Sequence, residues 1–384
     1  MANNLSAILP TIYLAADEVA RERVGFIPAV FRNSSAERAA VGQTITYDVV
    51  GAMTEGDVTP SATLVDASDQ TIGSGTMTIS KAKSIKFRWT GEEQVSLRTG
   101  DQPLGEDVLK NQFKQAMRRL CNLVENDLFT AAYQGASRAV GSAGTAPFGT
   151  AGDLSDFANV LEVLEANGAP DDDLHLVVGG AAMVNLRGKQ SVLFKVNEAG
   201  TDELLRRGKV GEVMGLNIHK SGQIAQVTKG TGASYVTSGS TAPGVSSIAL
   251  VTGTGTVLAG DVVTFAADST NKYVVGTGVA APGTISLNTP GAKVTIATAN
   301  ALTVGNSYTP NVAFAREAIH LITRVPAMPK EGDLAMDVVE IQDPVSGLAF
   351  QVAVYPGVRC VIYEVSMAWG CKAVKSDFIA TVMG

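Results

Sequence analysis

The sequence predicts an α+β protein in which one long helix is flanked by strand-rich segments. Three observations support this class. Residues 104–134 carry apolar side chains at spacings of three and four, residues 44–97 alternate apolar and polar side chains, and residues 229–311 are dense in Gly, Thr, Ser, Val and Ala. A chain of 384 residues is longer than a single hydrophobic core usually organises, so we expect several domains.

Composition and charge narrow the class of protein. Hydrophobic residues make up 45% and charged residues 17%, which is typical of a globular chain and excludes global disorder. The net charge of -7 disfavours tight binding of nucleic acid, because neutralising phosphates requires clustered Lys and Arg. Such a protein can still enclose nucleic acid without gripping it.

The cysteines and the apolar runs indicate where the chain resides. Cys121, Cys360 and Cys371 are odd in number and form no CxxC motif, so we expect neither a disulfide framework nor a structural zinc site. Residues 1–10 do not resemble a secretory signal, and no apolar run approaches the roughly 20 residues that span a bilayer. We therefore expect synthesis in the cytoplasm and no membrane partner.

The N-terminal half is expected to begin with two extended segments. Residues 1–45 are predicted to form an arm, with one short helix over 11–24, that lies on another surface of this subunit or the next. Residues 46–95 are predicted to form a long hairpin loop, whose base is anchored by Ile85, Phe87 and Trp89. An ordinary edge hairpin of a larger sheet is an equally open interpretation.

Residues 96–150 contain the clearest helix, over 104–134. Its apolar face is expected to include Leu109, Phe113, Met117 and Leu120. Acids in its first turn suit the helix dipole, and Gly135 follows as a stop. At 1.5 Å per residue this helix is roughly 45 Å long, which suits a structural spine.

The remainder divides into three predicted parts. Residues 151–228 have α/β character, with a buried strand over 174–178 between two helices. Residues 229–311 contain five charged residues and recurring short strand patterns, which favour a small inserted β domain over a flexible linker. Residues 312–384 read as strands that complete the fold begun before residue 229.

The sequence contains no recognisable catalytic signature. The phosphate-binding, dinucleotide, zinc-protease and nucleophile-elbow motifs are absent, so we expect no enzymatic activity, cofactor or metal. His175, His219 and His320 stand apart in the sequence, and we interpret each as a structural residue. The acids at 171–173 favour a solvated turn over a cation site, and Arg206 and Arg207 favour an interface over phosphate binding.

The order of these parts resembles the major capsid proteins of tailed bacteriophages with the Hong Kong-97-type fold. The resemblance extends over nearly the whole chain and is strongest to the coat-protein branch of short-tailed Salmonella phages, which carries an insertion domain. Two segments support it, residues 310–324 (PNVAFAREAIHLITR) and 369–375 (WGCKAVK). In this interpretation 1–45 resembles the N-arm, 46–95 the extended loop, 96–150 the peripheral domain, 151–228 the axial domain and 229–311 the insertion domain. Residues 312–384 return to the axial and peripheral domains.

The resemblance implies a non-catalytic shell subunit. It implies hexamers and pentamers of this chain in an icosahedral virion capsid around double-stranded DNA, with a scaffolding protein, a portal and a decoration protein as partners. Two alternatives stay open. One is an encapsulin-like nanocompartment of the same fold. The other is a β-rich surface adhesin, which the Gly/Thr-rich segment suggests and the long helix disfavours.

Overall fold

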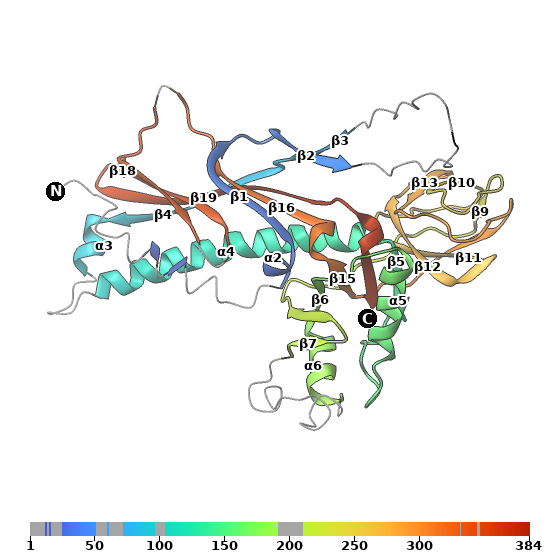
Figure 1. Ribbon diagram of the computed structural model, residues 1–384. Helices are drawn as coiled ribbons and strands as arrows, with labels where there is room; N and C mark the ends of the chain where they lie inside the picture. Colours follow the sequence, from blue (N-terminus) through green and yellow to red (C-terminus); the bar gives the residue numbers. More distant parts are fainter. Residues whose placement is uncertain are drawn as a thin grey trace.

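A computed structural model describes residues 12–13, 15–16, 25–50, 60, 72–96, 104–190, 210–330, 332–343 and 346–384. The molecule is elongated along its longest helix, α4 (Figure 1). One sheet covers α4 along much of its length, an α/β part lies beneath its C-terminal half, and a β-rich lobe lies beyond its C-terminal end (Figure 1).

The helix α4 (Leu104–Gln134) confirms the predicted helix and its bounds. Its buried face recurs every three or four residues, so one stripe of the helix faces the protein interior. The fully buried side chains of this stripe are Phe113, Met117, Leu120, Val124, Leu128 and Ala132. Among the described residues, no helix combines the length and the apolar character needed to cross a lipid bilayer.

The first sheet packs on α4 and contains six strands. Five strands follow the order β1-β16-β19-β18-β17. The sixth strand, β4, lies off this path and pairs with β19. Its strands are β1 (Phe31–Ala39), β4 (Lys81–Thr90), β16 (Ile319–Pro326), β17 (Asp337–Gln342), β18 (Ala349–Gly357) and β19 (Cys360–Ala373). The fourteen-residue β19 is the central strand, and its Val365, Met367 and Trp369 are buried in the core shared with α4.

The hairpin formed by β2 and β3 ends earlier in the sequence than predicted, at residue 78. β2 (Thr44–Val50) pairs with β3 (Ile72–Thr78) in register from Thr44↔Thr78 to Val50↔Ile72. Residues 81–90 form β4, which pairs with β19 over ten residues and so belongs to the main sheet. The prediction that Ile85, Phe87 and Trp89 anchor the hairpin was therefore wrong, because their strand pairs with a segment more than 270 residues away.

The N-terminal segment is partly integral to the sheet. After the short helix α2 (Phe26–Ala29), β1 pairs in parallel with β16. Within the segment predicted as an arm, residues 31–39 therefore lie on the main sheet of their own subunit. This strand had no visible signal because its sequence, FRNSSAERA, lacks apolar alternation. Of the helix predicted over 11–24, most positions lie outside the described residues.

A second, twelve-stranded sheet runs β11-β14-β9-β10-β13-β12-β5-β20-β15-β6-β8-β7. Its α/β half carries the helices α5 (Ser155–Ala166) and α6 (Gly180–Gly188). The strands of this half are β5 (Arg138–Gly141), β6 (Leu174–Val178), β7 (Glu212–Val213), β8 (Leu216–Lys220), β15 (Pro310–Ala315) and β20 (Ile379–Met383). The buried strand predicted over 174–178 is β6, which lies between β15 and β8.

The β-rich lobe comprises β9 to β14 around its own apolar core. Its strands are β9 (Tyr235–Thr237), β10 (Ser247–Val251), β11 (Val262–Phe265), β12 (Asp268–Thr277), β13 (Gly283–Leu287) and β14 (Ala301–Val304). Outside these strands, Ile296 makes an isolated bridge to Thr241. β12 pairs with β5, so the lobe shares a continuous sheet with the α/β half.

Candidate functional site

Most side chains singled out in the sequence meet in one core. Phe113, Met117 and Leu120 of α4 are fully buried there, Trp89 is almost so, and Ile85, Phe87 and Leu109 pack against them. The ring centroids of Phe87 and Phe113 lie 5.1 Å apart at nearly right angles, a favourable edge-to-face contact. These residues thus join α4 to β4 within one subunit. Arg206 and Arg207 lie outside the described residues.

The spine helix also carries two acids that tie other segments to it. The carboxylate of Glu125, 1% exposed, accepts the backbone N–H groups of Gly25 and Phe26 at 2.6 and 2.8 Å. The carboxylate of Asp127 accepts hydrogen bonds from Lys81 Nζ at 2.6 Å and from Trp369 Nε1 at 2.8 Å. The sequence analysis missed Glu125, although its position between Cys121 and Leu128 on an apolar face was a usable signal.

The base of the β2–β3 hairpin packs on the sheet face opposite α4. Met77 and Ile79 are buried there against Ile322 and Ala368. Around this cluster, the ring of His320 lies between Phe31 and Tyr47, with centroids 4.7 and 5.5 Å away. Burial lowers the pKa of His320, which favours a neutral ring. The described base of the hairpin is therefore fixed on the main sheet.

The hairpin and β4 have opposite charges. Residues 44–78 contain no Lys or Arg and five acids, Asp48, Glu55, Asp57, Asp66 and Asp69. β4 contains no acid and four bases, Lys81, Lys83, Lys86 and Arg88. Among the described residues, β4 pairs with β19 alone. In Figure 1 the described part of the hairpin lies above the middle of the molecule, and β4 extends from there toward the left end. The opposite charges of the two segments suit a contact between copies.

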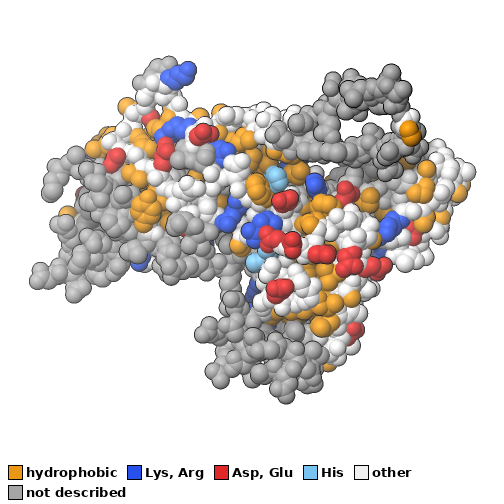
Figure 2. All heavy atoms as spheres, viewed as in Figure 1, with side chains coloured by type: hydrophobic (Ala, Val, Ile, Leu, Met, Phe, Trp, Pro, Cys, Tyr) orange, Lys and Arg blue, Asp and Glu red, His pale blue; other side chains and the backbone are white. Residues whose placement is uncertain are grey.

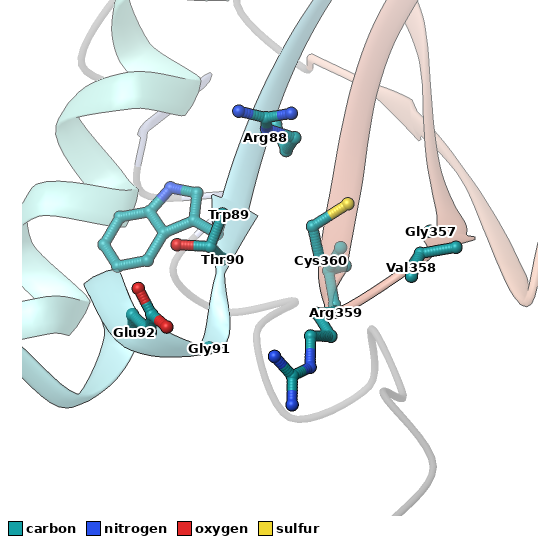
Figure 3. A pocket seen from close by; sticks show the side chains of 10 residues that line it. Arg88, Trp89, Thr90, Gly91, Glu92, Gly357, Val358, Arg359 and Cys360 are labelled. Carbon is teal, nitrogen blue, oxygen red and sulfur yellow. The ribbon is translucent and has the colours of Figure 1, made fainter.

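A hollow of about 740 Å³ lies at the end of the main sheet. Arg88 of β4, Glu92 at the start of α3 (Gly91–Ser96) and Arg359 and Cys360 of the β18–β19 turn line it (Figure 3). Catalysis by a thiol requires a neighbouring base that activates it. The described residues that line the hollow include Cys360 and Glu92 but no histidine.

Charge on the molecular surface is mixed. On the face shown in Figure 2, Lys and Arg side chains are interspersed with Asp and Glu, without an unbroken basic field. The described part of this face does not present the clustered cations that hold duplex DNA. Among the described residues, no group of three His, Cys, Asp or Glu side chains is placed to hold a metal ion.

The histidines are less isolated than the sequence indicated. His175 Nδ1 lies 3.0 Å from His219 Nε2, although 44 residues separate them. Asp173, the last acid of the predicted turn, lies 2.8 Å from Arg316 Nε and 2.9 Å from His175 Nε2. This acid is therefore a structural ion-pair partner.

Comparisons with known proteins give a likeness of fold. No protein-family description and no curated protein sequence matches the chain. The solved capsid of the cyanophage P-SCSP1u is similar over 94% of this chain and 88% of its own, at 13% identity and a TM-score of 0.50. A structure of Mycobacterium phage Che8 covers 89% and 84% at 14% identity and TM-score 0.45. A virus-like particle from Pyrococcus furiosus covers 97% and 98% at 10% identity and TM-score 0.42.

Proposed function

We propose that this chain is the subunit of a tailed-bacteriophage head and assembles with copies of itself into a closed icosahedral shell around double-stranded DNA. The observation that carries the proposal is the likeness in fold to the cyanophage capsid, which extends over nearly all of both chains. Function in such a protein lies in the surfaces that tile, and it requires no catalytic group.

The domain assignment follows the same proposal. We assign 1–45 to an N-arm that includes β1, 46–95 to an extended loop that ends in β4, and 96–150 to a peripheral domain with α4 as its spine. Residues 151–228 form the axial domain, 229–311 the insertion domain, and 312–384 return to both. The family resemblance to Salmonella phage coat proteins supports the insertion domain as a distinct unit.

We propose that opposite charges bring two copies of the subunit together when they first meet. The acidic hairpin of one subunit lies across the basic β4 of its neighbour, where opposite charges steer association. Lys81 and Lys86 bind Asp127 and Glu364 of their own subunit. Among the described residues no such close ion pair is formed by Lys83 or Arg88, and Arg88 interacts electrostatically with Glu93. Lys83 and Arg88 are therefore the cations we assign to the neighbour's hairpin.

A charge exchange tests this contact. The double variant Lys83→Glu/Arg88→Glu is expected to lose most sedimenting assemblies, and adding Glu55→Lys/Asp57→Lys is expected to restore them. Lys229→Glu/Lys293→Glu, an equal change in charge at two exposed sites in residues 229–311, is the matched control. Assembly that is unaffected by the double variant, or lost without rescue, contradicts the proposed contact.

The contents of the particles separate a phage head from the alternatives. Particles purified from infected or induced cells are expected to contain double-stranded DNA, detected by nuclease-protected nucleic acid. Particles filled with a protein cargo would instead indicate a nanocompartment, and a secreted chain on the cell surface would indicate an adhesin.

The scaffolding protein, portal and decoration protein are further proposals from the same resemblance. Co-purification of the assembled particles followed by mass spectrometry is expected to find a scaffold in early particles and a portal in all of them. Particles of native size that form and package DNA without either protein would contradict this part.

A further inference from the structure

His175 and His219 form a direct contact between two neighbouring strands. His175 lies on β6 and His219 on β8, which pair in parallel with Val177 opposite His219. Their ring centroids are 5.1 Å apart, and His175 Nδ1 lies 3.0 Å from His219 Nε2. The side chain of His175 is 3% exposed, so bulk water does not separate the rings.

The gap between these two nitrogens accommodates one hydrogen atom. If Asp173 accepts the Nε2 proton of His175, then His175 Nδ1 accepts a hydrogen bond from His219 Nε2. If Arg316 donates to His175 Nε2 at 3.1 Å, then His175 Nδ1 donates to His219 Nε2. One added proton leaves this bond intact in either arrangement. When both rings are protonated, His175 Nδ1 and His219 Nε2 each carry a hydrogen atom. Two donors then face each other at 3.0 Å, so the hydrogen bond between the rings breaks.

The surroundings oppose the charged form of the rings. Burial, Arg316 and the like charge of His175 lower the pKa of His219 to about 4. Burial also lowers the pKa of His175, and Arg316 adds to this while Asp173 opposes it. Arg32 of β1 acts electrostatically on Arg316, and the ring centroid of Phe314 on β15 lies 6.3 Å from that of His175.

The contact lies at one end of the twelve-stranded sheet. β8 pairs with β6 on one side and with the two-residue β7 on the other, so β6 connects this edge to the sheet. We propose that the His175–His219 pair is an acid-sensitive clasp that holds the β7–β8 edge onto the sheet at neutral pH and releases it when both rings are protonated. The proposal is independent of the shell function.

The direction of the pH effect follows from the lowered pKa values. The unfolded or released edge binds protons near pH 6.5, whereas the closed edge binds the second proton only near pH 4. The stabilising contribution of the clasp is therefore fully present above about pH 6.5 and is lost as the pH falls through about 4.

Hydrogen exchange measured by mass spectrometry on the full-length protein tests the clasp. Between pH 6.5 and 4, after correction for intrinsic exchange, protection of residues 216–220 is expected to fall by at least about tenfold. His219→Gln retains a group that can bond to His175 Nδ1 but cannot titrate, so protection is expected to stay nearly constant. His320→Gln, which removes another half-buried histidine, is expected to behave as the wild type.

Two outcomes would overturn the proposal. One is equal protection of residues 216–220 at both pH values in the wild type, and the other is an equal loss in His219→Gln. Nitrogen-15 NMR of the wild-type imidazoles provides a check that does not depend on how the variants fold. The clasp predicts two separated titration steps for the pair, and independent titration of both rings near pH 6.5 would exclude it.

Discussion

The carboxylate of Glu125 accepts the backbone N–H of Phe26 at 2.8 Å, inside the protein and 99 residues away in the sequence. Glu125 also binds the N–H groups of Gly25 and Ile27, at 2.6 and 3.1 Å. One side chain of the spine helix thus satisfies three donors at the start of α2, which α2 itself cannot satisfy. This contact fixes the point at which the N-terminal segment joins the body of the protein.

Replacing Glu125 by Gln is expected to destabilise the protein by about 1–3 kcal/mol, because an amide nitrogen then faces backbone donors without an acceptor. Chemical denaturation of the unassembled subunit measures the change. Glu165→Gln, an exposed acid on α5, is the control and is expected to change stability by less than about 0.5 kcal/mol. Equal stability of the two variants would contradict the role assigned to Glu125.

Gly25 allows the same segment to pass close to the α/β part. A Cβ atom there would lie 2.8 Å from Val177 Cγ1 and 2.9 Å from the backbone carbon of Lys220. Because backbone atoms cannot yield easily, Gly25→Ala is expected to cost about 1–3 kcal/mol in unfolding free energy. Gly180→Ala, where a Cβ atom meets nothing within 4 Å, is the matched control and is expected to be neutral or stabilising.

The aromatic contact between α4 and β4 is expected to be a large single contribution to stability. Phe113→Ala leaves a cavity between the rings of Phe87 and Tyr363, whose centroids lie 5.1 and 5.5 Å from Phe113. The expected loss is about 3–5 kcal/mol, seen as a lower midpoint of thermal unfolding. Val184→Ala, at a side chain that is 69% exposed, should leave the midpoint nearly unchanged. If Phe113→Ala lowered the midpoint of thermal unfolding only slightly, the contact between α4 and β4 would not be a main contribution to stability.

Asn288 joins the β-rich lobe to the end of the spine helix. Its side-chain nitrogen donates to the carbonyl oxygens of Gln134 and Ala136, both at 2.7 Å. Asn288→Asp removes the donor and brings negative charge to two carbonyl groups, so about 1–3 kcal/mol of stability should be lost. Asn306→Asp, at a site in the β14–β15 connection, is the control. An equal effect of both variants would show that the joint does not depend on Asn288.

The sequence predicted those elements whose periodicity is visible locally. The stripe on α4 and the short apolar run of β6 indicated these elements with correct bounds, because local burial determines their pattern. β1 could not be predicted, since its polar side chains bind distant groups, such as Arg38 to Glu340 at 2.6 Å. β20 was missed although four of the five residues in its run IATVM are apolar.

Contacts between distant segments were beyond sequence reasoning. The pairing of β4 with β19 depends on the whole sheet and has no local signal, so Trp89 was assigned to a hairpin base. The His175–His219 contact likewise results from parallel pairing of β6 and β8. The core role of Phe113 and Met117, by contrast, could be predicted from spacing alone.

Electron microscopy of the high-speed pellet, after expression of this chain alone and together with a scaffolding gene, tests the central claim most directly. We expect uniform closed shells when a scaffold is present, and shells mixed with spirals or sheets when it is absent. A chain that remains a compact monomer in the supernatant under both conditions would contradict a shell-forming function.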